Sequence, residues 1–289
     1  MSERNRIRIG NQTSFSASAV LQPFEYAVAN GFDAFEWFPD RKESGTGWTE
    51  SDISGDVRTM IRNTARAYDI SISVHAPGRL NPLEPGTDEL MHRTTEFAQD
   101  VGAALLNIHL MSGQGISGYA DAVIPLIRHL IRSGIRLSIE NTPDTGPRDF
   151  NELFTYLGNA GLIGRGHVGM CFDMGHANLC EDTRNDYLKY IDLLEPLVPV
   201  IHMHMHENYG DYDSHLPIFT GPAGNDISGV KELMLRMKER HFSGSIILEQ
   251  WPQPASMLRE ARNRLLDIIS KTDTDKWKFN LKEKKNEKN

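Results

Sequence analysis

Eight short apolar runs recur along the chain, and longer amphipathic segments separate them. The amphipathic segments have helical periodicity, for example in residues 56–68, 87–101, 119–133 and 230–240. Gly102 and Gly134 lie where two of these helices should end. Alternation of strand and helix predicts a parallel sheet. The predicted strands are residues 6–11, 34–38, 72–75, 105–109, 136–140, 168–173, 200–206 and 246–249.

Eight strands in a chain of 289 residues favour a closed (β/α)8 TIM barrel, a fold that typically takes about 250 residues. An open doubly wound sheet is the structural alternative. We expect a single domain, with the barrel in residues 1–270 and a charged, solvated C-terminal tail in residues 271–289. The tail has seven Lys and four acidic residues and so carries +3, which leaves −11 for the barrel out of a formal net charge of −8. An acidic barrel is a poor general binder of polyanions.

Composition and motifs also bear on the cellular compartment, on membrane association and on cofactors. The two cysteines, Cys171 and Cys180, form neither a disulfide framework nor a CxxC pair, which favours a reducing compartment. The N-terminus has no apolar run behind it, and no stretch approaches the roughly 18 apolar residues of a membrane span. We therefore expect a soluble, cytoplasmic protein that does not bind membranes. No GxGxxG, Walker or GxSxG motif is present, so we expect no nucleotide cofactor.

Potential metal-binding side chains are most frequent in residues 200–217, where His202, His204 and His206 alternate along a predicted strand. Alternate side chains of a strand point the same way, so these imidazoles should line one surface. The loop that follows adds Asp213 and His215. Imidazole and carboxylate donors together are what zinc and similar divalent metals prefer.

Potential ligands also stand at the ends of the other strands, from the third onward. The ends of parallel strands meet at one mouth of a barrel, where barrel active sites are built. Carboxylates gathered at that density would repel one another without a cation between them. The nine candidates are His75, His109, Glu140, Asp173, His176, His204, Asp213, His215 and Glu249.

The position of each candidate relative to its strand divides the nine into two groups. Four of them occupy inward strand ends and are the primary metal ligands that we predict: Glu140, Asp173, His204 and Glu249. The other five, His75, His109, His176, Asp213 and His215, are additional metal ligands or groups that orient a substrate. We predict neither His202 nor His206 as a ligand, although one of them could support the ligands from behind. Glu36 and Phe38 share one face of the second predicted strand. They either line the pocket or only contribute to packing inside the barrel. The remaining histidines, His92, His129, His167 and His241, should lie at the surface.

At these residues the chain resembles the xylose-isomerase-like TIM-barrel superfamily, which contains sugar isomerases, epimerases and endonuclease IV. The resemblance covers about residues 6–270. Its most specific segments are residues 139–142 (Ile-Glu-Asn-Thr), 172–176 (Phe-Asp-Met-Gly-His) and 204–217. In ketose epimerases of this group one metal is held by residues that correspond to Glu140, Asp173, His204 and Glu249. The two glutamates exchange the proton at the reacting carbon, and the counterpart of His176 touches the substrate.

The resemblance also has a second branch. Ketohexose 3-epimerases carry a further Glu and an Arg where this chain has Gly146 and Gly210, so that substrate contact set is not expected here. Endonuclease IV holds three zinc ions with nine ligands, and all nine candidates above are their counterparts. Less specialised sugar isomerase-like members keep the same Asp-x-His-Leu-Pro turn, so the full set does not by itself indicate a nuclease.

We therefore expect a metal-dependent isomerase or epimerase of a sugar or sugar-like polyol. A divalent Zn, Mn or Co ion would acidify a C–H beside a carbonyl, and Glu140 and Glu249 would take and return the proton. The alternatives are an endonuclease IV-like multi-zinc phosphodiesterase acting on abasic DNA, a keto-sugar lyase or dehydratase, and a non-enzymatic sugar- or metal-binding barrel. The expected partner is a small-molecule sugar rather than nucleic acid, and the sequence leaves a homo-oligomer open.

Overall fold

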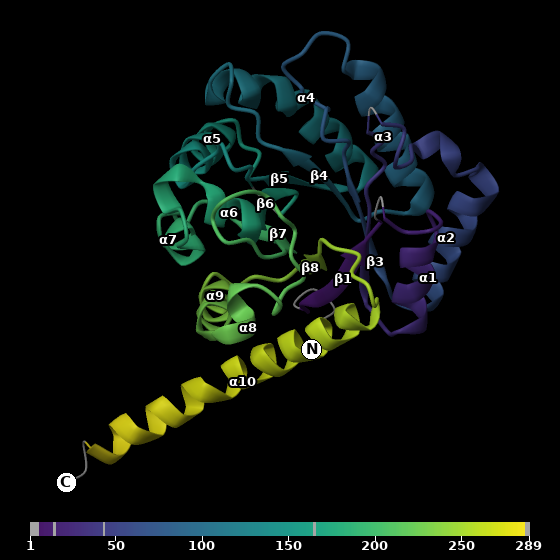
Figure 1. The fold of residues 1–289 in the computed structure, drawn as a ribbon. Coiled ribbons are helices and arrows are strands. Elements are labelled where there is room, and N and C mark those ends of the chain that lie inside the picture. Colours follow the sequence, from purple (N-terminus) through teal and green to yellow (C-terminus); the bar gives the residue numbers. More distant parts are fainter. Residues whose placement is uncertain (1–5, 14–15, 43, 164–165, 287–289) are drawn as a thin grey trace.

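The computed structural model describes residues 6–13, 16–42, 44–163 and 166–286, with side chains through Thr272. Eight parallel strands close into one barrel in the order β1 to β8, which confirms the predicted TIM barrel over the open sheet. Figure 1 shows the helices arranged around the outside of the strands. The strands are β1 Arg8–Gln12, β2 Ala34–Trp37, β3 Ser71–His75, β4 Leu105–His109, β5 Arg136–Glu140, β6 Val168–Asp173, β7 Val200–Met205 and β8 Ser245–Leu248.

Most strands are followed by a helix that packs back onto the barrel. Gly102 and Gly134 end α3 and α4 with φ values of 74° and 71°, a left-handed conformation that glycine adopts without steric cost. The α-helices are α1 Gln22–Ala29, α2 Gly55–Ala67, α3 Asp88–Val101, α4 Ile116–Ser133, α5 Pro147–Asn159, α6 Met174–Leu179, α7 Tyr187–Asp192, α8 Pro222–Asn225, α9 Ser228–Glu239 and α10 Ser256–Asn286, and short 3₁₀ helices lie at Glu50–Asp52 and Glu181–Thr183.

The last helix crosses the boundary that the sequence suggested. Helix α10 continues without a break past residue 270 and extends away from the barrel (Figure 1). The expected solvation of the tail concerns mainly side chains beyond Thr272, which lie outside the described residues. Among the described helices, none combines the length and the apolar character that crossing a membrane requires.

The apolar core lies between the strands and the helices. On β2, Phe35 and Trp37 point outward, with ring centroids 4.9 Å apart. The ring of Phe24 on α1 lies 5.2 Å from that of Phe35 and 5.5 Å from that of Trp37. Burial of each large apolar side chain contributes about 1.5–3 kcal/mol to folding. This outer layer therefore fixes which face of each strand points into the barrel.

The inside of the barrel is unusually polar. Barrel interiors are normally filled with branched apolar side chains. Here buried polar residues stand one or two steps below the mouth, among them Asn11, Glu36, Ser73, Asn107, Ser138 and His202. A buried polar group is costly unless it finds a partner, so this layer must be bonded to something. Asn107 bonds upward to Glu140 at the mouth, and His202 bonds to Glu36 within the layer.

Candidate metal centre

The four predicted primary ligands come together at the mouth of the barrel. Glu140 on β5, Asp173 on β6, His204 on β7 and Glu249 after β8 each offer one ligand atom, and these atoms lie within 4.8 Å of one another. Nδ1 of His204 is 3.2 Å from Oε1 of Glu249, 3.3 Å from Oε2 of Glu140 and 3.8 Å from Oδ2 of Asp173. All four side chains are buried. Their separation is compatible with sharing one ion.

Two further predicted residues approach the same carboxylate from the side of β3 and β4. Nε2 of His75 lies 3.0 Å from Oε2 of Glu140, and Nε2 of His109 lies 3.7 Å from Oε1. The ligand atoms of these three residues are also within 4.8 Å of one another. Glu140 thus faces two potential ion positions.

A third group combines His176 on α6 with Asp213 and His215 on the loop after β7. Nε2 of His176 is 3.3 Å and Nε2 of His215 is 2.9 Å from the same oxygen of Asp213. His206 joins them, with its Nδ1 3.8 Å from the other Asp213 oxygen and its ring stacked on that of His215 at 3.9 Å. The side chains of all nine candidates therefore line one mouth, and His206, which we did not predict as a ligand, lies among them.

Backbone carbonyl oxygens orient three of the outer histidines. In each of them Nδ1 donates to a carbonyl and Nε2 faces a carboxylate, and Nδ1 of His176 also lies 3.3 Å from Oε1 of Glu140. Hydrogen bonds of this kind fix the tautomer and ring orientation of metal-binding histidines. The acceptors are Ala76 for His75 at 2.6 Å, Asn141 for His176 at 2.8 Å and Glu249 for His215 at 3.2 Å.

The segment after β6 shows how sequence creates this geometry locally. Asp173 caps helix α6, and its Oδ1 accepts from the backbone N–H of His176 at 2.6 Å. The other oxygen, Oδ2, lies 3.1 Å from Nε2 of His206. A side chain on Gly175 would overlap the imidazole of His206, so only glycine fits there. The Asp-Met-Gly-His sequence thus serves both helix capping and close packing against β7.

Glu140 is held from below by residues that the sequence reading missed. Nδ2 of Asn107 donates a short hydrogen bond to Oε2 of Glu140, and Oγ of Ser138 donates to Oδ1 of Asn107 at 2.6 Å. Asn107 stands two residues before His109, and Ser138 two before Glu140. The two-residue period of a strand was therefore the signal that could have identified them.

The carboxylate of Glu36 lies under His204. Its Oε2 accepts from Nε2 of His202 at 2.8 Å. Its Oε1 is also 2.8 Å from Nε2 of His204, at an angle too bent for a well-formed hydrogen bond. All three side chains are at most 1% exposed. Of the two readings open for Glu36, a pocket residue or mere packing, the contacts favour a polar role beneath the pocket.

The electrostatics distinguish the two glutamates. Burial alone would raise the pKa of Glu140, but His204, His109 and His75 outweigh it and hold that pKa well below its usual range. Burial raises the pKa of Glu249, and the opposing influence of His204 does not cancel that rise. Two carboxylates whose pKa values are pushed apart can divide the roles of acid and base.

The donor set suits a divalent cation. Burial would lower the pKa of His204, but the carboxylates of Glu249, Glu140 and Glu36 raise it well above its usual range. Without an ion, then, the imidazoles supply the positive charge that the carboxylates need. Oε1 of Glu140, Nδ1 of His204 and Nδ1 of His206 are buried and have no hydrogen-bond partner among the described residues. Cations bound in the two groups to which these atoms belong would satisfy them.

Two cavities adjoin the centre. One of about 420 Å³ touches Glu249 and His215 and is lined by polar and aromatic side chains, including Gln12, Gln250 and Trp251. The second, of about 590 Å³, touches Asp213. Its lining has six acidic residues and two arginines, Arg148 and Arg184, together with Gly146. The first is the smaller and has the less charged lining.

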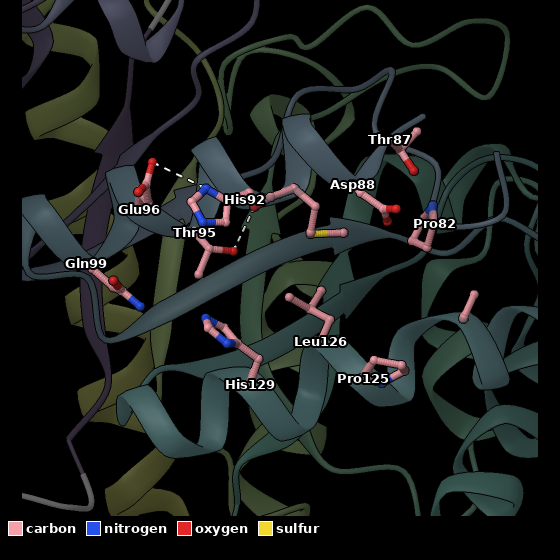
Figure 2. A pocket seen from close by; sticks show the side chains of 12 residues that line it. Pro82, Thr87, Asp88, His92, Thr95, Glu96, Gln99, Pro125, Leu126 and His129 are labelled. Carbon is pink, nitrogen blue, oxygen red and sulfur yellow. Dashed lines mark hydrogen bonds and ion pairs between the residues drawn. The ribbon is translucent and has the colours of Figure 1, made fainter. Parts of the chain in front are cut away.

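A third cavity, of about 380 Å³, lies on the outer surface between α3 and α4 and contains no residue of the centre. Figure 2 shows His92 and His129 on its two walls, with His92 paired to Glu96 at 3.4 Å. These two histidines and His241 are exposed, as predicted, whereas His167 is half-buried. None of the four lies with the nine candidates in a metal-binding group of the described residues.

Solved structures share this architecture. A D-tagatose 3-epimerase-like protein superposes with a TM-score of 0.67 at 21% identity, covering 91% of this chain and 98% of that one. A D-psicose 3-epimerase, crystallised in the presence of D-fructose, gives 0.66 at 15% identity, covering 91% and 99%. Endonuclease IV from Thermus thermophilus gives 0.62 at 21% identity, covering 91% and 99%. At these identities the likeness establishes the fold alone.

Sequence comparison agrees with the fold that the solved structures share. An uncharacterized protein of Methanocaldococcus jannaschii is 25% identical over 237 residues, which are 73% of this chain and 75% of the relative. A family model described as the xylose isomerase-like TIM barrel matches residues 24–268. The match spans the barrel from α1 into α10 and includes all nine candidate ligands. The chain therefore belongs to the xylose isomerase-like TIM barrel family.

Proposed function

We propose that the protein is a metal-dependent isomerase or epimerase of a sugar or sugar-like polyol. The observation that carries the proposal is the pair Glu140 and Glu249, which approach Nδ1 of His204 from β5 and from the end of β8 at 3.3 Å and 3.2 Å. A carboxylate on each side of one ion position suits proton removal from one face of a carbon and return to the other. Relatives in fold that are named as ketose 3-epimerases support this reaction class.

The ligands that we propose for the ion are Glu140, Asp173, His204 and Glu249. Once bound, the ion would supply Lewis acidity that polarises a carbonyl beside the reacting C–H. Glu249, whose pKa is raised by burial, would take the proton, and Glu140 would exchange it on the opposite face. His176, and also His75, would hold substrate hydroxyl groups.

The cavity of about 420 Å³ beside Glu249 supports a hydroxyl-bearing substrate. Oε1 of Gln12, both amide atoms of Gln250 and Nε1 of Trp251 are buried without a hydrogen-bond partner among the described residues. Hydroxyl groups can both donate to and accept from such atoms. The aromatic rings of Phe38 and Trp251 add apolar surface, a combination that small-molecule sites use.

Deuterium incorporation tests the proposal. Protein loaded with Mn, Co or Zn is incubated in D₂O with D-fructose, D-tagatose or D-psicose, and NMR follows the hydrogen on the carbon beside the carbonyl. We expect metal-dependent deuterium incorporation and a second sugar, and neither after chelation. Loaded protein with one ion per chain that exchanges no hydrogen in any of the three ketoses would overturn the proposal. Loss of water or carbon–carbon cleavage after exchange would instead indicate a lyase or dehydratase.

The second candidate function is a multi-zinc phosphodiesterase acting on abasic DNA. The observation that favours it is that three groups of donors, rather than one, line the mouth. Several ions could activate a water and hold phosphate oxygens. Three zinc ions per chain with cleavage of an abasic duplex would establish this function, whereas one ion per chain favours the isomerase. The net charge of −8 is unfavourable for general DNA binding.

A further inference from the structure

The ring of His204 is held differently from the rings of three other histidines of the centre. His75, His176 and His215 direct Nε2 at the carboxylates and give Nδ1 to a backbone carbonyl. His204 has the reverse orientation, with Nδ1 toward Glu140 and Glu249. Among the described residues, no backbone carbonyl hydrogen-bonds to its ring. Some other group must fix its tautomer.

Glu36 is the group in position to do so. Its Oε1 lies 2.8 Å from Nε2 of His204, on the side of the ring away from the mouth. Its second oxygen is occupied by Nε2 of His202 at 2.8 Å, which prevents free rotation of the carboxylate. Glu36 lies on β2, whereas His202 and His204 lie on β7, so the contact crosses the inside of the barrel. The side chains of all three residues are buried.

We propose that Glu36 is a positioning residue, which with His202 holds His204 as the Nε2–H tautomer so that Nδ1 presents its lone pair to the metal. An ionised carboxylate only accepts hydrogen bonds, so a neutral imidazole facing it must carry its hydrogen on Nε2. A carboxylate behind a ligand histidine also raises the basicity of that ligand. The inference rests on the proposed metal centre but not on the reaction that the centre performs.

One neighbour offers an alternative. The thiol of Cys171 is fully buried, and its sulfur lies within 4.8 Å of ring nitrogens of His202 and His204. A thiol is a weak acceptor compared with a carboxylate. Glu36 is therefore the stronger anchor, and Cys171→Ala serves as a matched control that removes the competing contact to the same ring.

The substitution Glu36→Gln is a sharp test. A carboxylate offers an oxygen to each of the two histidines, by a hydrogen bond to His202 and a bent 2.8 Å contact to His204, whereas a carboxamide has one acceptor and one donor and cannot do both. Loss of such a partner typically weakens metal binding about 10- to 100-fold. We expect that loss for zinc or cobalt in competition with a chromophoric chelator, an altered visible spectrum of the cobalt-loaded protein, and unchanged affinity for Cys171→Ala. Equal affinity of Glu36→Gln and wild type, or a loss confined to Cys171→Ala, would overturn the proposal.

A second measurement does not depend on the Glu36 variant. Nitrogen-15 NMR of histidine-labelled, zinc-loaded wild-type protein distinguishes the ring nitrogen that carries hydrogen from the ring nitrogen that binds zinc, and replacing His204 by Asn assigns its signals. We expect the hydrogen of neutral His204 on Nε2, and the opposite tautomer would overturn the proposal even if Glu36→Gln failed to fold. A wild-type protein that binds no divalent metal would also overturn it. Tight metal binding that depends on Glu36, without any exchange in ketoses, would instead refute only the proposed function.

Discussion

Replacing Glu249 by Gln separates the proposed chemistry from the stability of the barrel. The carboxylate is 6% exposed, and its Oε1 lies 3.2 Å from Nδ1 of His204. Two unit charges about 4 Å apart attract by about 4 kcal/mol at an effective dielectric constant of about 20. At about 1.4 kcal/mol per tenfold change, removing this charge should weaken metal binding by up to about 10³-fold. The amide oxygen remains a ligand, so we expect about 10²- to 10³-fold.

The same substitution should not destabilise the metal-free protein. Burial raises the pKa of Glu249 above its unfolded value, so the ionised form disfavours folding at pH 7. Nearby Glu140 and Asp173 add to this rise. The variant without metal should therefore melt at or above the temperature of the wild type. Removal of a general base should also lower proton exchange by about 10²- to 10⁴-fold at saturating metal.

Three measurements check these expectations: chelator competition for affinity, thermal melting in EDTA, and deuterium incorporation at saturating metal. Glu50→Gln is the matched control, because Glu50 is a buried carboxylate outside the centre that pairs with Arg93 at 2.8 Å. Its metal affinity should equal that of the wild type. The reasoning fails if Glu249→Gln binds metal within about threefold of the wild type, or exchanges deuterium at the normal rate.

Two further outcomes follow from the structure. Gly175→Ala should lower the free energy of unfolding of the metal-free protein, measured with urea, by about 1–3 kcal/mol, because the new methyl group overlaps the ring of His206. Gly113→Ala is the control, since a methyl group there meets open space and should change the stability little. Equal stability of the two variants would contradict the close packing at Gly175. Asp213 outweighs the effect of burial and raises the pKa of His215 to about 9, so in the metal-free protein its stabilising contribution is complete below about pH 6.5 and is lost as the pH rises toward 9. Ligand imidazoles must be neutral, so the increase in melting temperature caused by cobalt should be larger at pH 8.5 than at pH 6.5, and an increase that is the same at both pH values would refute this linkage.

Local sequence determined the fold and the nine predicted members of the cluster. Short apolar runs separated by amphipathic segments leave few alternatives to a barrel, and the observed strands agree with the predicted ones to within two residues at each end. A strand end is also a position on the mouth, because all strands are parallel. For that reason Glu140, Asp173, His204 and Glu249, spread over more than 100 positions, could be grouped before any coordinates were known.

The tertiary structure decided which side chains of the cluster contact each other. Which nitrogen faces which carboxylate depends on the register between strands, including the irregularity at Met170 and Cys171 that sets Asp173 opposite His204. Glu36 and His202 are 166 positions apart, and no sequence period relates them. His206 lies beyond the end of β7, where alternation no longer fixes direction, and its contacts with Asp173, Gly175 and His215 place it in the centre. Periodicity acts along one strand, whereas these contacts arise between strands, and barrel closure alone brings the strands together.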